Sequence, residues 1–196
     1  IFSSNIKIND LYKDGLQRNQ FIPFIKIMKK KCFEQTLTIK DDYRKSQNND
    51  RYLYPLNEIT SFKINKLFRK LTKDKIKQEK ILSIKGRKFN IKNYYEGVAR
   101  LDFNDLCNKN IGAEDYIKIA DVCKYILIEN LPNFDDNNSN QQQRFITLID
   151  IIYEKKVNLS ISSVSKLDKL TTASSLSGPF KRTLSRLHEL TSSLNI

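Results

Sequence analysis

Apolar residues recur with helical spacing in five stretches of the chain. Successive apolar positions lie three or four residues apart there, which places them on one face of a helix. The stretch at 141–156 is apolar almost all the way round, so we predict a buried helix there. Pro23 lies inside the first stretch, and we therefore expect two helical pieces that meet near residue 22. The predicted helical stretches are residues 11–32, 59–71, 113–122, 141–156 and 180–192.

Alternating and continuous apolar runs predict strands between these helices. Residues 98–103 alternate between the apolar Ala99, Leu101 and Phe103 and a second set, Val98, Arg100 and Asp102, as in a strand with one buried face. Residues 125–128 are all apolar, as in a strand that is buried on both faces. Residues 85–88, which include Gly86, are predicted to form the turn of a hairpin that spans residues 81–91. Shorter strands are predicted at residues 1–4, 33–39 and 157–161.

The order of these elements predicts the fold class. A strand, a helix and a second strand follow one another between residues 124 and 161, and such a unit implies a parallel sheet. We therefore predict an α/β protein with a parallel sheet, flanking helices and a C-terminal helix. A small β-rich insertion is expected near residues 50–103. The Ser- and Thr-rich residues 162–178 predict a loop with one helical turn.

The net charge of +13 has two interpretations. Lysine supplies 26 of the 35 basic residues, beside 24 isoleucines and 19 asparagines, which is the bias of an A/T-rich genome. The alternative is a polyanionic partner. Residues 63–92 hold twelve basic residues against Asp74 and Glu79. This segment favours, as an alternative function, a module that binds nucleic acid or an anionic surface without catalysis. We expect any contact with nucleic acid to be weak and non-specific, because Arg is not enriched.

Several kinds of site are excluded by composition. Three cysteines without C-x-x-C spacing and a single histidine, His188, cannot build a zinc site, and they indicate a reducing compartment. None of the five glycines lies in a phosphate loop. No apolar run reaches the roughly 18–20 residues of a transmembrane helix, so we expect no transmembrane segment.

Acidic and basic side chains near predicted strand ends are candidates for chemistry. Glu129 and Asp150 each follow apolar residues, as do the acids that hold Mg²⁺ in nucleotide hydrolases. In a buried helix, Asp150 has the alternative of pairing with a donor. Asn5 follows a predicted strand, and Arg18 begins the next helix, so both can face a ligand crevice. Their alternatives are a turn residue and a solvated helix residue.

Blocks of residues along nearly the whole chain resemble the ZapE family of AAA+-related P-loop ATPases, which has mitochondrial counterparts. The blocks occur in the family's order. They are Leu11-Tyr12-x-x-Gly15-Leu16-Gln17-Arg18-x-x-Phe21-x-Pro23-Phe24-Ile25, Asp42-Tyr43-Arg44, Phe103-x-x-Leu106-Cys107, Gly112-Ala113-x-Asp115-Tyr116, Pro132, Arg144-Phe145-Ile146-x-Leu148-Ile149-Asp150-x-x-Tyr153 and Arg182-Thr183-x-Ser185-Arg186-Leu187-x-Glu189. Departures from the family pattern are Gln143, Ser163 and Leu190-Thr191.

The resemblance implies an ATPase that couples ATP hydrolysis to the remodelling of a protein partner, in cell division or in protein quality control. It implies ATP and Mg²⁺ as cofactors and a cytoplasmic location, or a mitochondrial one in a eukaryote. The family's phosphate loop and Mg²⁺-binding acids precede a strand that ends in Ser-Asn. We therefore expect this chain to be the C-terminal part, inactive alone, with residues 1–50 as the end of the ATPase core, 51–103 as a basic β-rich insertion and 104–196 as an α/β segment.

The resemblance also implies roles for individual residues. Asn5 resembles the first sensor, which orients the attacking water. Arg18 resembles the arginine finger, which stabilises charge on the transferred phosphoryl group, including that of a neighbouring subunit in a homo-oligomer. Arg182 and Arg186 lie four residues apart, and either resembles the second sensor, which contacts bound nucleotide. The alternative for this last pair is a surface ion pair between Arg186 and Glu189. No residue of this chain is expected to bind a metal.

Overall fold

The computed structural model describes residues 4, 6–13, 15–35 and 50–192. The chain forms two compact units, Ile1–Asp41 and Asp42–Ile196, and each is described by itself.

The first unit holds one long helix, α1 (Arg18–Lys31), preceded by a single 3-10 turn, η1 (Ile8–Asp10). Pro23 lies inside α1, so the expected division into two helical pieces near residue 22 is wrong. Pro23 is the sixth residue of the helix, and the first four N–H groups of a helix have no intrahelical partner in any case. Its missing N–H therefore costs only one hydrogen bond close to the helix start. The predicted strands at 1–4 and 33–39 lie largely outside the described residues, and Phe33 to Gln35 have no regular structure.

The second unit is built on one mixed sheet of six strands in the order β1-β6-β5-β4-β3-β2. The pairs β1–β6, β6–β5 and β5–β4 are parallel, and β4–β3 and β3–β2 are antiparallel. The predicted parallel sheet is therefore confirmed for four strands, and the hairpin extends it in antiparallel fashion. The strands are β1 (Tyr52–Leu53), β2 (Lys77–Ile84), β3 (Arg87–Tyr95), β4 (Val98–Asp102), β5 (Tyr125–Leu131) and β6 (Asn158–Ser163).

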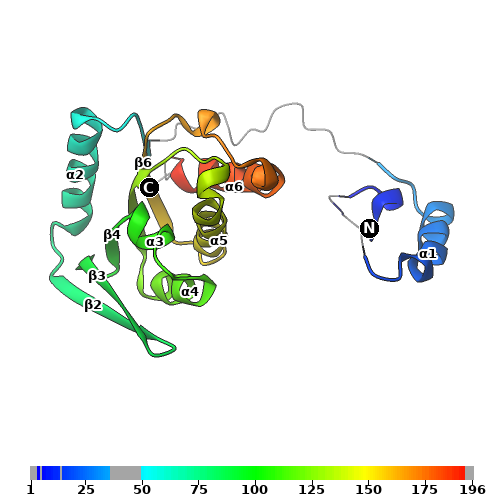
Figure 1. Ribbon diagram of the computed structural model, residues 1–196, viewed down its shortest axis with the longest axis horizontal. Helices are drawn as coiled ribbons and strands as arrows, with labels where there is room; N and C mark the ends of the chain where they lie inside the picture. Colours follow the sequence, from blue (N-terminus) through cyan, green and yellow to red (C-terminus); the bar gives the residue numbers. More distant parts are fainter. Residues whose placement is uncertain (1–3, 5, 14, 36–49, 193–196) are drawn as a thin grey trace. The chain divides into compact units, whose positions relative to one another are not determined.

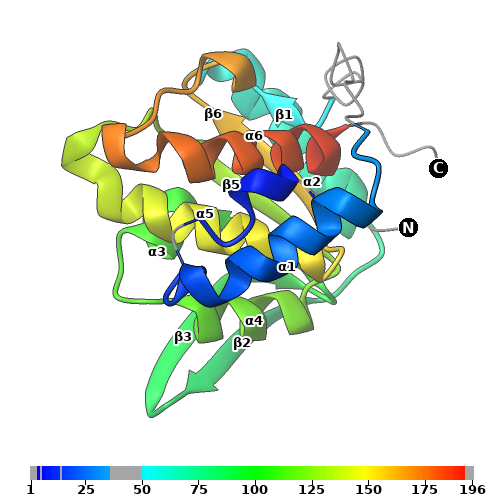
Figure 2. The same ribbon diagram turned by 90° about the vertical axis from the view of Figure 1, so that its right-hand side faces the viewer.

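Helices cover both faces of this sheet, with α2 on one side and α3 to α6 on the other (Figure 1). Helix α2 packs its inner residues on Val98, Tyr125 and Leu127. The other face carries the larger core, in which α4, α5 and α6 lie over the sheet (Figure 2). The helices are α2 (Glu58–Thr72), α3 (Phe103–Cys107), α4 (Ala113–Val122), α5 (Ser139–Glu154) and α6 (Ser177–Thr191).

Local sequence signals explain where these elements begin and turn. Asn57 caps α2 by accepting a hydrogen bond from the backbone N–H of Thr60. Asp102 caps α3 in the same way, so the strand predicted at 98–103 ends one residue early. Lys85 and Gly86 both have positive φ angles, as a two-residue hairpin turn requires. The loop predicted at 162–178 contains two 3-10 turns, η4 (Leu167–Lys169) and η5 (Ser174–Leu176).

Residues 51–103 contribute β1 to β4 to the same sheet as the later strands, and they contribute α2 to one of its faces. The division of the chain at residues 50 and 103 stays a prediction. Among the described residues, no helix is both long enough and apolar enough to cross a membrane.

Candidate functional site

Arg18 is held at the start of α1 by carbonyl groups of its own unit. Its guanidinium donates hydrogen bonds to the backbone oxygens of Asn9 at 2.9 Å and Lys13 at 3.5 Å. The side chain is half-buried, and its Nε has no hydrogen-bond partner among the described residues. The other candidate from this region, Asn5, lies outside the described residues.

The loop before Arg18 has a close approach that explains its glycine. A Cβ at Gly15 would lie 2.3 Å from the ring of Tyr12, well inside van der Waals contact. That ring packs against Phe21 of α1, with 5.5 Å between the ring centroids. Phe21 in turn packs on Phe24 at 5.1 Å. A glycine is therefore needed for Tyr12 to fold over the loop and join the aromatic cluster on the helix that carries Arg18.

In the second unit, Asp150 binds both Arg182 and Arg186, the two candidates for contact with bound nucleotide. Arg182 donates to one carboxylate oxygen of Asp150 at 2.8 Å, and Arg186 donates to the other. The Arg186 guanidinium also lies over the Tyr153 ring, 4.9 Å from its centroid. The interpretation of Asp150 as a paired carboxylate is therefore confirmed. The structure pairs Arg186 with Asp150 of α5, whereas Glu189 accepts a hydrogen bond from the Tyr153 hydroxyl at 2.9 Å.

The two arginines differ in their exposure to solvent. The Arg182 side chain is 62% exposed, whereas those of Arg186 and Asp150 are 18% and 23% exposed. Two guanidinium groups share the Asp150 carboxylate, and Glu189 is bound to the hydroxyl of the Tyr153 ring that Arg186 covers. The guanidinium nearest to solvent is that of Arg182, where an anion could reach it.

Other residues of the blocks that resemble the ZapE family join neighbouring elements of the fold. Arg144 of α5 donates to the backbone oxygen of Cys107 at 3.0 Å, and Tyr116 of α4 donates to that of Leu106 at 2.7 Å. Asp115 caps α4 by accepting from the N–H of Gly112 at 2.9 Å. These contacts fix α3, α4 and α5 around the core and explain why the blocks combine polar and apolar residues.

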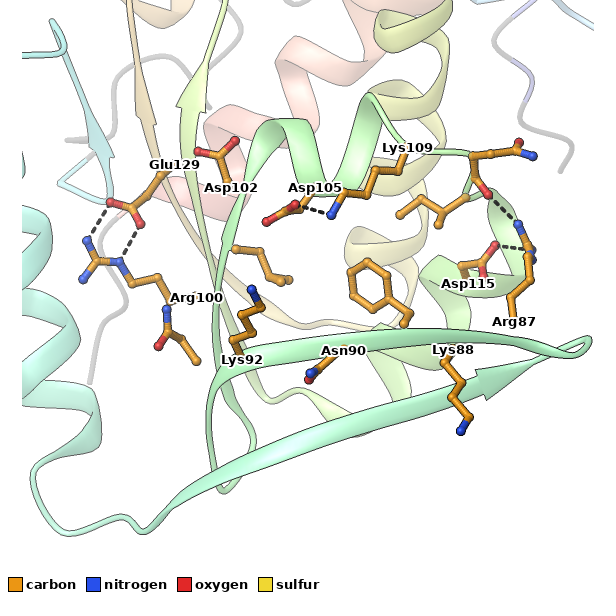
Figure 3. Close-up of a pocket in the computed structure, with 15 residues that line it drawn as sticks. Arg87, Lys88, Asn90, Lys92, Arg100, Asp102, Asp105, Lys109, Asp115 and Glu129 are labelled. Carbon is orange, nitrogen blue, oxygen red and sulfur yellow. Dashed lines mark hydrogen bonds and ion pairs between the residues drawn. The ribbon is translucent and has the colours of Figure 1, made fainter.

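The structure also has a cleft that the sequence reasoning missed. It has a volume of about 530 Å³ and lies between β3 and the segment that runs from α3 to α4 (Figure 3). It forms because β3 pairs with β4 only at Asn93–Tyr95, and β4 then gives way to α3. A pairing register of this kind leaves no signal in the local sequence.

Ion pairs engage three of the four carboxylates that line this cleft, and the fourth, Asp102, accepts hydrogen bonds from the Asn104 N–H and the Asn130 side chain. Arg100 binds Glu129 through two hydrogen bonds of 2.5 and 2.7 Å (Figure 3). Lys109 pairs with Asp105. At the other end, Arg87 pairs with Asp115 at 2.9 Å. Glu129, which resembled a Mg²⁺-binding acid in the sequence, is therefore engaged by arginine. No group of acidic, Cys or His side chains in the described ranges is arranged to hold a metal ion.

Burial makes the two core thiols poor nucleophiles. Desolvation raises the pKa of Cys107 and that of Cys123 to about 12, from an ordinary value of 9.0. Both are therefore protonated thiols at neutral pH, and the nucleophilic form of cysteine is the thiolate.

Comparison with known proteins decides the family. The profile of the AFG1-like ATPases matches residues 1–195. The chain belongs to the AFG1-like ATPase family. The resemblance to ZapE found in the sequence is thereby confirmed, because the curated relatives in this family include ZapE.

Two curated relatives of the family align over almost the whole chain. Lactation elevated protein 1 homolog B of Danio rerio is 30% identical over 195 residues, which are 97% of this chain and 39% of that protein. Cell division protein ZapE of Escherichia coli (strain K12) is 28% identical over 194 residues, which are 98% of this chain and 52% of that protein. The chain thus spans about half the length of these relatives or less. No solved structure gives a significant match.

Proposed function

We propose that the protein containing this chain hydrolyses ATP and uses the energy to remodel a protein partner. The match to the AFG1-like ATPase family over residues 1–195 carries this proposal. The name of the ZapE relative supports a role in cell division, and protein quality control is the alternative setting. We further propose a cytoplasmic location, or a mitochondrial one in a eukaryotic cell.

The described residues supply only some of the groups that binding and hydrolysis of ATP with Mg²⁺ require. ATP supplies the phosphoryl group for transfer, and Mg²⁺ neutralises charge on its phosphates. Arginines can contribute further positive charge, whereas the described carboxylates do not gather into a metal site. We therefore propose that the phosphate loop and the Mg²⁺ ligands come from a part of the protein outside this chain.

Arg18 is our candidate for the arginine finger. A guanidinium near the transferred phosphoryl group stabilises the negative charge that develops there. The bonds from Arg18 to the Asn9 and Lys13 carbonyls are to neutral acceptors, so no carboxylate neutralises its charge among the described residues. In a homo-oligomer, Arg18 of one subunit would act on the nucleotide of its neighbour. Asn5, four residues before Asn9, is the proposed sensor that orients water.

Of the two arginines on α6, we propose that Arg182 contacts nucleotide. Its side chain is 62% exposed and is held at one end by Asp150. Arg186 is mostly buried between Asp150 and the Tyr153 ring, so it has less freedom to meet a ligand. Arg186 and Asp150 would then position Arg182 rather than bind ATP themselves.

Replacing Arg18 by Ala in the full-length protein tests the proposed function. We expect kcat to fall by roughly 10³-fold with little change in nucleotide affinity, because the finger acts on charge in the transition state. Steady-state ATPase assays and nucleotide titrations measure the two effects. Lys26→Ala, an exposed change on the same helix, is the matched control.

Mixing experiments examine the subunit arrangement. Arg18→Ala protein mixed with a variant dead in its phosphate loop should regain activity if Arg18 completes a neighbour's site. A turnover within about twofold of wild type for Arg18→Ala alone would contradict the finger role. A full-length protein without ATPase activity would contradict the proposed function as a whole.

A further inference from the structure

The outward face of α2 carries apolar side chains that do not serve the core. The inward residues Ile64, Leu67 and Phe68 pack on the sheet. Ile59 and Phe62 lie one helical turn apart and are 65% and 68% exposed. Folding of the described unit therefore does not explain why these two positions are apolar.

The loop that leads into α2 extends this apolar surface. Tyr54 and Leu56 are 45% and 37% exposed, and Pro55 between them is also exposed. Five of the nine residues from 54 to 62 are thus apolar and exposed. Contiguous exposed apolar residues next to polar ones mark interaction surfaces.

From its second turn onward, the outward face of α2 is basic. Lys63, Lys66 and Lys70 follow Ile59 and Phe62 at helical spacing, so all five lie on one side of the helix. These lysines are exposed, and the structure pairs none of them with a carboxylate of the described residues. Between residues 63 and 77, seven basic residues stand against the single acid Asp74.

The kind of charge indicates which anionic partner fits. Six of those seven basic residues are lysines, which act as compact point charges, whereas arginine provides the planar fork that recognises individual carboxylates or phosphates. Exposed Phe and Ile followed by a row of lysines on one side of the helix supply the two attractions of a peripheral membrane contact, burial of apolar side chains and attraction to anionic headgroups. Nucleic acid would leave Leu56 and Ile59 without a contact. A second copy of the chain, with its net charge of +13, would bring like charges together.

We propose that residues 54–73 bind the surface of a lipid bilayer that contains anionic headgroups. Phe62, Ile59 and Leu56 enter the boundary between headgroups and acyl chains, while the lysines of α2 lie near the lipid phosphates. The association is peripheral. The proposal does not rest on the proposed ATP hydrolysis, because it is argued only from the exposed side chains of residues 54–70.

Vesicle binding by residues 1–196 tests the proposal. We expect the chain to float with phosphatidylcholine vesicles that contain about 30% phosphatidylglycerol and to stay free of pure phosphatidylcholine vesicles. Changing Lys63, Lys66 and Lys70 together to Gln should lower the partition coefficient by about 100-fold, or about fivefold per lysine. The same change at three exposed lysines elsewhere, Lys118, Lys169 and Lys181, removes equal charge and should lower it far less.

The apolar part is tested separately with a fluorescent reporter. The chain contains no tryptophan, so Phe62→Trp introduces a single one. Its emission should shift to the blue with anionic vesicles, whereas that of Val164→Trp, at a position 39% exposed on another part of the unit, should not. Ile59→Ser with Phe62→Ser should lower binding by about tenfold or more. All these positions are exposed, and unchanged thermal unfolding confirms that the variants fold.

Three results would overturn the membrane proposal. They are equal loss of binding in the two triple-lysine variants, no blue shift of Phe62→Trp, and tighter binding to duplex DNA or to a glutamate-rich peptide than to the anionic vesicles at the same salt. The last result would assign the surface to nucleic acid or to an acidic protein segment. None of these results bears on ATP hydrolysis by the full-length protein.

Discussion

At the scale of single residues, burial and close packing decide what each side chain can do. Gly15 leaves room for the Tyr12 ring, and Asp115 caps α4 while it holds Arg87. Cys107 is fully buried, whereas Cys32 is partly exposed on the first unit. The three thiols of the chain should therefore differ widely in reactivity.

We predict that iodoacetamide at pH 8 modifies Cys32 long before Cys107 or Cys123. With pKa values raised to about 12, the buried thiols are ionised to roughly one part in 10⁴ at this pH, and the core also blocks access. Raising the pH to 10 should still leave them largely protonated while the protein is folded. Peptide mass spectrometry over a time course measures each rate.

The denatured chain provides the control for this experiment. Unfolding removes the desolvation that raises the two pKa values, so in denaturant all three cysteines should react at similar rates. Rapid modification of Cys107 in the native protein would show that α3 opens or that its thiol is not buried.

At the scale of elements, side chains that meet across helices hold the second unit together. Asp150 of α5 binds two arginines of α6, and Tyr153 of α5 binds Glu189 of α6. The ion pairs differ in burial, and exposed pairs contribute little to stability. The mostly buried Arg186 should therefore matter more to the packing of α6 than the exposed Arg182.

We predict that Arg186→Ala lowers the free energy of unfolding by about 1–3 kcal/mol, because it removes a charged hydrogen bond and the contact with the Tyr153 ring. Arg182→Ala should cost less than about 1 kcal/mol. For a chain of this size each kcal/mol corresponds to about 2–4 °C in Tm. Thermal unfolding of residues 1–196 measures both, with Lys181→Ala as an exposed control on α6.

Comparing the two arginine variants also tests their proposed roles. If Arg182→Ala destabilised the chain as much as Arg186→Ala, Arg182 would be a structural residue, and the proposal that it contacts nucleotide would lose its basis.

At the scale of the whole molecule, the chain holds the arginines that we propose for contact with ATP but no phosphate loop. Arg18 lies in the first unit and Arg182 in the second. None of the five glycines of the sequence belongs to a loop that could cradle phosphates through backbone N–H groups. The chain spans 52% of ZapE and 39% of the Danio rerio relative, so the remaining parts of such proteins are available to supply that loop.

We predict that residues 1–196 neither bind nor hydrolyse ATP appreciably. Two or three guanidinium groups without a backbone cradle and Mg²⁺ ligands give only weak, salt-sensitive attraction to phosphate. Titration of a fluorescent ATP analogue should show no saturation in the micromolar range, whereas a protein extended upstream to include a phosphate loop should bind. Micromolar affinity of the chain by itself would place the nucleotide site within these residues.

From residue 57 onward, the sequence by itself determined the kind and order of the strands and long helices, whereas it did not predict the short helix α3. Periodicity identified α2, α4, α5 and α6 to within three residues at each end, and the wholly apolar run at 125–128 identified a central strand. These signals are local, because a helix or strand must direct its apolar residues toward one side to bury them. Family membership was also readable, since the blocks keep their order along the chain.

Only the tertiary structure decided which distant residues meet. It placed Asp150 against arginines 32 and 36 residues away, opened the cleft where β3 leaves β4, and left Ile59 and Phe62 outside the core. Each outcome depends on the register of strands and on the rotation of a helix about its axis. Those are chosen by the packing of the whole core, to which residues far apart in the chain contribute together. The local pattern of α2 shows that it has an apolar side, but the sheet beneath it determines which apolar residues remain exposed.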